Sequence, residues 1–543
     1  MQRTLVLLLL LLATNASDDA SRHASTPADD VVTRRVVAVT RSGPVAGIAD
    51  ALAVRWRGVP YARPPVGELR FRPPLPPEPW NETLDCTLQA RRICPQLASL
   101  FGTLVVGEED CLYLDVFAPV APAPDPRPVL VFNHGGAYVL GDDSEWGLYD
   151  GSRLASNTSV VVVTLDYRLG VLGFLAHPAL RAAGHSSNLG LLDQRAALRW
   201  VVDNIAAFGG DPRRILLSGQ SAGAMSVCSH VASPASEGLF RAAIMESGNC
   251  DSPLLWAPLD AALQQGLAFA AAHGCQDEDD DGRTVACLQS LPLAILMAHN
   301  LEPSGAPLAP LVAWVPVVDG LADGVPEMPL SALRRSRRVP CIVGTVRDEG
   351  TMFAAAASSM FGKAPMPITE MELAELLARV YNKSTVVAVL LRYSTGSPTE
   401  RLALILRDAL FACPARRTAA ALAANGRAWQ YIFDYELHWA VSRLGLGTYH
   451  ASELPFVFRN RGKHAFSDSD ETVEALFSQL WGTFAREADM KASMPPEWPA
   501  YNAKDEPVLR MNEAPTVAKH LLSNNCSFWD EVEPRIHGAV AVS

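Results

Sequence analysis

The chain has 543 residues, of which 49% are hydrophobic, 7% aromatic and 19% charged, and its formal net charge is −12. This composition is typical of a globular protein with a large core and argues against a disordered chain. The negative charge argues against binding to nucleic acid or to an anionic membrane surface.

Residues 1–16 have the pattern of a secretory signal peptide. A leucine-rich run at residues 5–12 is followed by the small residues Thr14-Asn15-Ala16, which suit cleavage before Ser17. The run is short for a transmembrane anchor, which is the alternative interpretation. The rest of the chain has no apolar stretch of spanning length and no lipid-anchor signal at its end. We therefore expect a secreted protein without a membrane anchor, whose polar residues 17–35 form a mobile leader.

Ten cysteines in an exported chain predict disulfides, although spacing alone does not give their connectivity. Cys275 and Cys287 bracket an acidic run at residues 277–281, which we interpret as a solvated loop, with a calcium site as the alternative. Zinc-type spacing does not occur, so we expect no metal.

Asparagine sequons predict glycosylated surface turns. They stand at Asn81, Asn157 and Asn382. A further formal sequon at Asn525 is less credible if the next residue, Cys526, is bridged.

The order of the predicted elements indicates an α/β protein. After a proline-rich extended segment at residues 63–80, an alternating strand is expected at residues 112–117. Apolar strands are expected at residues 129–133, 159–165, 215–218, 242–245, 341–344 and 428–435. Helices are expected at residues 189–208, 254–273, 370–381 and 400–425. Alternation of strands and helices predicts a large, mostly parallel central sheet with helices on both faces. We see no linker that separates domains, so residues 36–537 are expected to form one domain with a helical cap.

The stretch Gly219-Gln220-Ser221-Ala222-Gly223 joins a predicted strand to a predicted helix. Glycines on both sides allow a turn so tight that the central serine is strained, with its hydroxyl exposed at the positive end of the helix dipole. Ser221 is therefore a candidate nucleophile. The alternative is an ordinary strand–helix turn with a capping serine.

A serine nucleophile needs a base, and the base needs an orienting carboxylate. His450 lies at the end of a glycine-bearing loop and just before an apolar segment at residues 453–458, which suits delivery of an imidazole to a cleft. Asp348 and Glu349 both follow closely on the strand at residues 341–344, and physical reasoning alone does not choose between them.

The stretch Asn133-His134-Gly135-Gly136-Ala137 follows a buried strand. Residues without bulky side chains leave backbone N–H groups open to the negative oxygen of a tetrahedral intermediate. Gly136, Ala137 and Ala222 are the candidate donors, and an ordinary Gly-Gly turn is the alternative.

Several stretches together resemble the type-B carboxylesterase family, which includes the cholinesterases. Apart from the serine turn, they are residues 58–62 (GVPYA), 64–71 (PPVGELRF), 109–114 (EDCLYL), 134–136 (HGG), 167–170 (YRLG) and 208–212 (FGGDP). The resemblance covers nearly all of the chain after the leader. It implies the α/β-hydrolase fold and selects Glu349 as the acid, with His450 as base, Ser221 as nucleophile and Gly136, Ala137 and Ala222 as oxyanion donors.

The resemblance also implies scaffold features. The family's disulfides map to Cys94–Cys111, Cys275–Cys287 and Cys413–Cys526, which leaves Cys86, Cys228, Cys250 and Cys341 free or buried. Two structural ion pairs map to Arg70 with Glu109 and to Arg168 with Asp193.

Departures from the cholinesterases bear on the substrate. Gln220 stands where they carry Glu, and the Cys94–Cys111 loop contains Phe101 but lacks their cation-stacking Trp, so acetylcholine is disfavoured. The same loop is short for the flap of a lipase. We expect a secreted serine carboxylesterase acting on a small-molecule ester without cofactor. A lipase or cholinesterase, or a cholinesterase-like adhesion or recognition protein without activity, are the alternatives.

Overall fold

The structure is a computed structural model that describes residues 33–88, 92–98, 104–182, 184–251, 256–277, 279–298, 314–335, 338–357, 367–438, 445–460, 466–490 and 497–540. The expected signal peptide at residues 1–16, most of the leader and Phe101 lie outside the described residues. No helix in the described ranges has the length and apolar character needed to cross a membrane.

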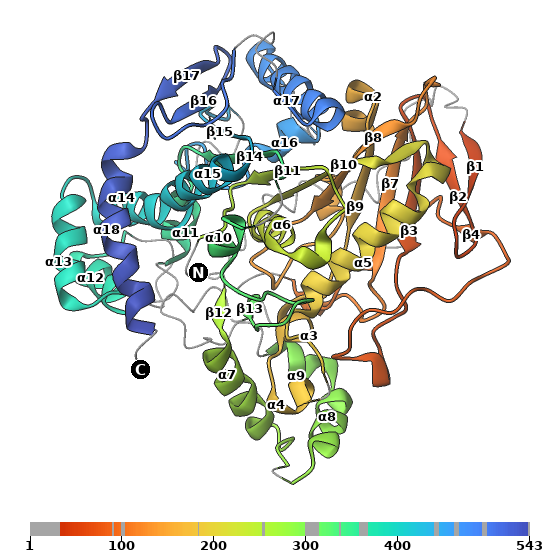
Figure 1. Ribbon diagram of the computed structural model, residues 1–543, viewed down its shortest axis with the longest axis horizontal. Helices are drawn as coiled ribbons and strands as arrows, with labels where there is room; N and C mark the ends of the chain where they lie inside the picture. The colour runs from red at the N-terminus through yellow and green to blue at the C-terminus, as the bar shows by residue number, and fades with distance from the viewer. Residues whose placement is uncertain are drawn as a thin grey trace.

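A 13-stranded sheet runs through the molecule in the order β1-β2-β3-β7-β9-β8-β10-β11-β14-β15-β16-β17, with β4 paired to β2 (Figure 1). The strands are β1 Arg34–Val39, β2 Pro44–Ala49, β3 Ala53–Pro60, β4 Leu84–Asp85, β7 Tyr113–Pro119, β8 Arg127–Asn133, β9 Val161–Leu165, β10 Gly210–Gln220, β11 Ala242–Glu246, β14 Cys341–Val346, β15 Ala428–Phe433, β16 Pro507–Met511 and β17 Thr516–Lys519. Two small separate sheets pair β5 Gln96–Leu97 with β6 Val105–Val106 and β12 Ala257–Pro258 with β13 Val317–Val318.

The centre of the large sheet is parallel and its margins are antiparallel. Neighbours from β9 through β8, β10, β11, β14 and β15 to β16 run parallel, whereas β1 to β3, β7 and β17 pair antiparallel. Every residue of β8, β9, β11, β14 and β15 is buried, which is consistent with their mostly apolar sequences. The carboxyl ends of the parallel strands meet at one edge, where open α/β sheets bind ligands.

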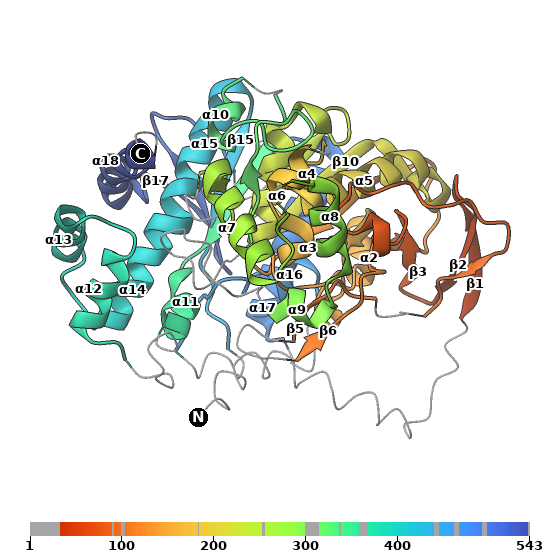
Figure 2. The same ribbon diagram turned by 90° about the horizontal axis from the view of Figure 1, so that it is seen from below.

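Helices cover both faces of this sheet. The helices of the described chain are α2 Ser152–Thr158, α3 Gly170–Phe174, α4 Pro178–Ala182, α5 Leu189–Asn204, α6 Ala222–Ala232, α7 Leu259–Ala272, α8 Asp281–Ser290, α9 Leu293–Ala298, α10 Pro329–Leu333, α11 Gly350–Ala357, α12 Glu370–Ala378, α13 Lys383–Arg392, α14 Pro398–Leu406, α15 Cys413–Asn425, α16 Leu454–Val457, α17 Asp468–Glu487 and α18 Ser523–Val540. One core joins α5, α6 and α15 to the sheet, and a second joins α2, α16 and α17 to its other face. Helices α12–α14 and α18 gather at the end opposite β1–β4 (Figures 1 and 2).

The expected strands are confirmed, and the differences lie at element ends and within two expected helices. The helix expected at residues 254–273 begins only at Leu259, because Ala257–Pro258 pair with β13 as strand β12. Strand β1 begins at Arg34, so the sheet starts inside the segment expected to be leader. The helix expected at residues 189–208 closes as a 3₁₀ turn, Ile205–Phe208, before the left-handed Gly209. The helical stretch expected at residues 400–425 contains a π-helical turn, Arg407–Ala412, between α14 and α15. Such wide turns often occur at functional sites.

The acidic run between Cys275 and Cys287 opens a helix. Asp280 is the N-cap of α8, and its carboxylate accepts the backbone N–H of Arg283 at 3.0 Å. Within the described part of the chain, no group of three or more His, Cys, Asp or Glu side chains has the arrangement of a metal site.

Disulfides join Cys94 to Cys111, Cys275 to Cys287 and Cys413 to Cys526, as the resemblance implies. The expectation for the remaining cysteines needs a correction. Cys228 on α6 and Cys250 are buried but not free, because they form a fourth bridge, whereas Cys86 and Cys341 are free and buried. Both expected ion pairs are present, Arg70–Glu109 at 2.5 Å and Arg168–Asp193 at 2.7 Å.

Candidate active site

Ser221 lies at the junction of β10 and α6, at the carboxyl edge of the parallel strands. Its backbone has φ 57° and ψ −126°, a strained conformation for a residue with a side chain. The N–H of Ser221 donates to the Glu246 carbonyl at 2.8 Å, which ties the turn to the end of β11. The side chain is partly exposed at the N-terminal end of α6. A serine in this position has its hydroxyl raised above the sheet, as a nucleophile requires.

The glycines beside Ser221 are required by close backbone contacts. A Cβ atom on Gly223 would lie 2.0 Å from the Asn133 carbonyl oxygen, and one on Gly219 would lie 2.6 Å from the Gly223 carbonyl carbon. Either distance is below contact, so no other residue fits without movement of the backbone.

The loop after β8 lies directly beside this turn. A Cβ atom on Gly135 would be 3.0 Å from the Cβ of Ser221. The backbone then takes positive φ at three successive residues, Gly136, Ala137 and Tyr138, with φ of 104°, 54° and 62°. Among the described residues, the N–H groups of Gly136, Ala137 and Ala222 have no hydrogen-bond acceptor. The structure therefore keeps these three donors open next to Ser221.

Contacts between His134 and Tyr167 hold this loop in place. Its ring stacks on Tyr167 at 4.4 Å between centroids, and the Tyr167 hydroxyl donates to the His134 carbonyl at 2.9 Å. Burial lowers the pKa of His134 to about 4, so the ring is neutral and adds no charge beside the loop.

The two acidic residues that follow β14 have different partners. Glu349 is fully buried; its Oε1 accepts the Val346 N–H at 2.9 Å, and its Oε2 lies 2.6 Å from Nδ1 of His450. Asp348 instead accepts the backbone N–H of Thr448 at 2.9 Å and returns its own N–H to the Thr448 carbonyl at 3.0 Å. Glu349 therefore contacts the imidazole, and Asp348 holds the loop that carries it.

His450 is 4% exposed and hydrogen-bonds at both ring nitrogens. Nδ1 contacts Glu349, and Nε2 lies 3.2 Å from Nε2 of Gln220, the residue before Ser221. Since an amide nitrogen can only donate, Nε2 of the ring is the acceptor and Nδ1 carries the proton. Within the described residues no hydrogen bond joins the ring to the Ser221 hydroxyl, and proton-transfer contacts commonly tighten only when substrate binds.

Two phenylalanines pack on the His450 ring. The ring centroid of Phe411 lies 4.9 Å from that of the imidazole, and Phe353 lies at 5.1 Å. The two phenyl rings also stack on each other at 5.5 Å. Phe353 is on α11, and Phe411 is on the π-turn, so two separate elements limit the movement of the imidazole.

Two further carboxyl groups are fully buried near Glu349. Burial raises the pKa of Glu246 to about 7, although the Ser218 hydroxyl and the Trp481 indole donate to it at 2.9 and 3.1 Å. Burial also raises the pKa of Glu453 well above its usual value, and the nearby Glu246 and Glu349 carboxylates add to that shift. Burial therefore favours the protonated form of both carboxyl groups relative to carboxyl groups in water.

Sequence reasoning missed the contacts that hold the imidazole. Gln220 stood out only as a change of charge, yet its amide bonds to Nε2 of His450. Nothing in the local sequence marks Phe411, because its contact depends on how the π-turn places it. Asp348 was a candidate because it is adjacent to Glu349. The sequence did not indicate that Glu349 contacts His450 whereas Asp348 contacts the backbone of Thr448.

A family model described as the carboxylesterase family matches residues 34–529. The para-nitrobenzyl esterase of Bacillus subtilis strain 168 is 35% identical over 499 residues, covering 89% of this chain and 96% of that protein. The cocaine esterase of Homo sapiens is 32% identical over 558 aligned positions, covering 97% of this chain and 94% of that protein. The solved structure of a PNB esterase matches with a TM-score of 0.76 at 33% identity, covering 91% of this chain and 99% of that one.

The family match spans the central sheet, the serine turn and the C-terminal helix up to Trp529. The solved relative has the same fold over almost its entire length, which identifies the parallel-centred sheet with helices on both faces as an α/β-hydrolase fold. The chain therefore belongs to the carboxylesterase family and is a carboxylic ester hydrolase.

Proposed function

We propose that the chain is a secreted serine carboxylesterase in which Ser221 is the nucleophile, His450 the general base and Glu349 the carboxylate that orients it. The supporting observation is the 2.6 Å contact between Nδ1 of His450 and Glu349, with Nε2 directed at the turn that holds Ser221. A carboxylate at Nδ1 selects the tautomer whose Nε2 lone pair accepts a proton.

In the acylation step, the Ser221 oxygen attacks the ester carbonyl carbon while Nε2 of His450 takes the hydroxyl proton. The hydrogen bond from the Gln220 amide to Nε2 of His450 must first break, because the single lone pair on Nε2 accepts only one strong hydrogen bond. The carbonyl oxygen becomes negative and accepts hydrogen bonds from the N–H groups of Gly136, Ala137 and Ala222. The C–O bond to the alcohol then breaks, and His450 returns the proton to the departing alkoxide.

In the deacylation step, water replaces the alcohol. His450 takes a proton from the water, whose oxygen attacks the acyl carbon, and the same N–H groups hold the second tetrahedral oxygen. Ser221 leaves with the proton from His450, and the carboxylic acid departs. Glu349 stays ionised throughout and stabilises the imidazolium formed in each half-reaction.

We propose small, uncharged esters as the substrates. The names of the relatives, para-nitrobenzyl esterase and cocaine esterase, point to small esters. Gln220 puts a neutral amide rather than a carboxylate beside the base, so the site has no anion there to favour a cationic alcohol.

Hydrolysis of p-nitrophenyl esters of increasing acyl length tests this function. We expect release of p-nitrophenol from short-chain esters, and we expect Ser221→Ala to lose nearly all turnover, by about 10⁴-fold or more as for other serine nucleophiles. Equal rates for Ser221→Ala and the wild-type protein would end the proposal and favour a recognition role. A matched control is Ser229→Ala, which removes a hydroxyl from the same helix at a residue that takes no part in the proposed reaction.

We also propose that the chain is secreted and carries N-glycans at three asparagines. Asn81, Asn157 and Asn382 are all exposed; Asn157 lies on α2 rather than in a turn, and Asn382 is the N-cap of α13. Expression of the full chain in a secreting animal cell should deliver protein to the medium, and a glycosidase that removes N-glycans should lower its mass. Retention of the protein inside the cell would contradict the proposed signal peptide at residues 1–16.

We also propose that residues 36–537 form a single domain. One sheet contains strands from both ends of this range, and its central strands come from the middle. Limited proteolysis should therefore give one transition from intact chain to small peptides, whereas a stable half-length fragment would contradict this.

A further inference from the structure

The π-turn that carries Phe411 is held by side chains from other parts of the fold. A π-turn contains one residue more than an α-turn, so its relaxation to regular helix would rotate the flanking residues by about 100° relative to each other. Such a rotation would move Phe411 away from His450. The turn therefore needs contacts that favour the wide geometry.

Asp408 provides one of these contacts. It is buried on the π-turn and pairs with Arg407, and its Oδ2 also accepts the Tyr393 hydroxyl at 2.7 Å and the Asn525 side-chain amide at 2.9 Å. Asn525 belongs to α18, the C-terminal helix. Trp529 on the same helix donates its indole N–H to the Tyr393 hydroxyl at 2.8 Å, which closes a chain of hydrogen bonds from α18 to Asp408.

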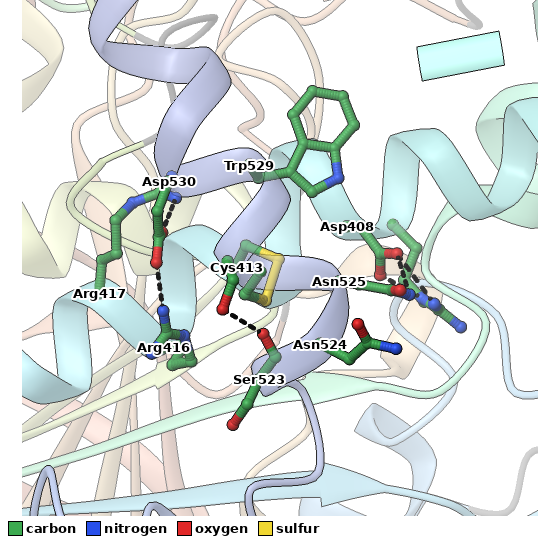
Figure 3. Close-up of a disulfide and its surroundings, with 12 residues drawn as sticks. Asp408, Cys413, Arg416, Arg417, Ser523, Asn524, Asn525, Trp529 and Asp530 are labelled. Carbon is green, nitrogen blue, oxygen red and sulfur yellow. Dashed lines mark hydrogen bonds and ion pairs between the residues drawn. A yellow bond between two sulfur atoms is a disulfide. The ribbon is translucent and has the colours of Figure 1, made fainter. Parts of the chain in front are cut away.

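One disulfide and ion pairs hold α18 against this turn. Figure 3 shows the Cys413–Cys526 bridge with Asp408 and Asn525 beside it. Cys413 follows the π-turn directly, and Cys526 follows Asn525. On the other side of the bridge, Arg416 and Arg417 of α15 pair with Asp530 of α18 (Figure 3).

A second contact holds the π-turn, and it comes from the segment that is linked to helix α6 beside Ser221. The Asn249 side-chain amide donates to the Leu410 carbonyl at 2.9 Å, next to Phe411. The neighbouring Cys250 is bonded to Cys228 on α6, the helix that starts at the serine turn. The two disulfides thus anchor the segments that hold the π-turn from both sides.

We propose that α18 is a positioning element for catalysis: the Asn525–Asp408 hydrogen bond sets the π-turn, and the turn holds Phe411 against the imidazole of His450. This inference rests on the proposed role of His450 as the base. Neither Asn525 nor Asp408 contacts the substrate; both act through Phe411.

The test compares Asn525→Ala with Ser527→Ala in the full-length protein. Asn525→Ala removes the donor to Asp408 and also the formal sequon at Asn525-Cys526-Ser527. Ser527→Ala removes the sequon and an exposed hydroxyl that donates to the Ser523 carbonyl of the same helix at 2.8 Å, but it leaves Asn525 in place, so it controls for glycosylation and for change on α18. We expect Asn525→Ala to lower kcat by about 3- to 30-fold with KM changed less than about twofold, because misplacement of a catalytic group by a fraction of an ångström has effects of this order.

The burst kinetics of a p-nitrophenyl ester give a second readout. Acylation and deacylation both pass a proton through His450, so Asn525→Ala should slow the two steps by similar factors, which loss of substrate binding would not do. Phe411→Leu should reduce kcat in the same way. The double variant Asn525→Ala/Phe411→Leu should be no slower than the slower single variant, because both changes act by one route.

Three outcomes would overturn the inference: a kcat for Asn525→Ala within twofold of Ser527→Ala, single-variant effects that multiply in the double variant, or slowing of one chemical step only. If Asn525→Ala does not fold, Tyr393→Phe replaces it, since it removes only the hydroxyl that bridges Trp529 and Asp408. A separate His450→Gln variant that keeps full activity would refute the proposed function itself, and the inference with it. Loss of activity in His450→Gln together with an unaffected Asn525→Ala would refute the inference alone.

Discussion

Replacement of Gln220 by Glu offers a direct test of the electrostatics at the base. The Gln220 side chain is 3% exposed, and its amide nitrogen lies 3.2 Å from Nε2 of His450. Glutamate has the same shape but presents an oxygen that only accepts hydrogen bonds. A neutral imidazole would then face an acceptor with its own lone pair, whereas an imidazolium would donate to it, so Gln220→Glu favours the protonated ring.

The size of the effect follows from the distance. Two unit charges about 4 Å apart attract by about 4 kcal/mol at the effective dielectric constant of a protein site. Since about 1.4 kcal/mol corresponds to one pH unit, this attraction alone would move the acid limb of kcat/KM by about three units. Desolvation of the new carboxylate at so buried a position opposes its ionisation and offsets part of this gain. We therefore expect the midpoint of the acid limb to rise by about one to two units.

The measurement is kcat/KM for a neutral p-nitrophenyl ester from pH 5 to pH 9. Gln220→Glu should lose activity at neutral pH and recover it at alkaline pH, because deprotonation of the ring restores the base. Gln220→Met is the matched control, since it fills the same space without charge or hydrogen bond and should leave the midpoint near that of the wild-type protein. An unchanged midpoint in Gln220→Glu, or an equal shift in Gln220→Met, would refute the placement of Gln220 beside the base.

The remaining predictions concern stability. Burial raises the pKa of Glu246 from 4.5 to about 7, so between these pH values the folded chain keeps a proton that the unfolded chain releases, and stability falls by about 3 kcal/mol as pH rises. Glu246→Gln should therefore melt higher, relative to wild type, at pH 8 than at pH 5; a constant difference would contradict the shift. Gly223→Ala should abolish folding or activity, because its methyl group would lie 2.0 Å from the Asn133 carbonyl oxygen, and a protein with normal activity and melting temperature would argue against that contact. Replacement of Cys228 and Cys250 by Ser should cost about 3 kcal/mol for a loop of this length, seen as a lower melting temperature than wild type under non-reducing conditions.

The central strands were predictable because burial on both faces leaves a continuous apolar sequence. Val161–Leu165 and Arg127–Asn133 are buried at every position, and no amphipathic pattern competes with that signal. The order of the strands in the sheet was not available from such patterns. No pattern within β8 indicates that it lies between β9 and β10, because strand order depends on contacts between segments far apart in the sequence.

The serine turn was predictable for a similar reason. Its features are local: a strand that ends, two glycines that the backbone contacts require, and a helix that begins. The base and the acid are separated from it in sequence by long segments, so their convergence depends on the parallel strands ending at one edge. Asp348 and Glu349 are adjacent, yet Glu349 contacts His450 whereas Asp348 accepts the backbone N–H of Thr448, and adjacency in sequence does not distinguish these partners.

The Cys228–Cys250 bridge shows why spacing in sequence was insufficient. Gln220 pairs with Glu246 in parallel register, so the residues after β10 and those after β11 leave the sheet at the same level. Helix α6 then runs back along the sheet from Ala222, and the segment after Glu246 follows it, which brings Cys228 to within 5.5 Å of Cys250 between Cα atoms. The bridge is a consequence of strand register, and a register is a property of the assembled sheet. For the same reason the Asn249 contact with the π-turn, and through it the support of Phe411 beside His450, becomes visible only when the strands are in place.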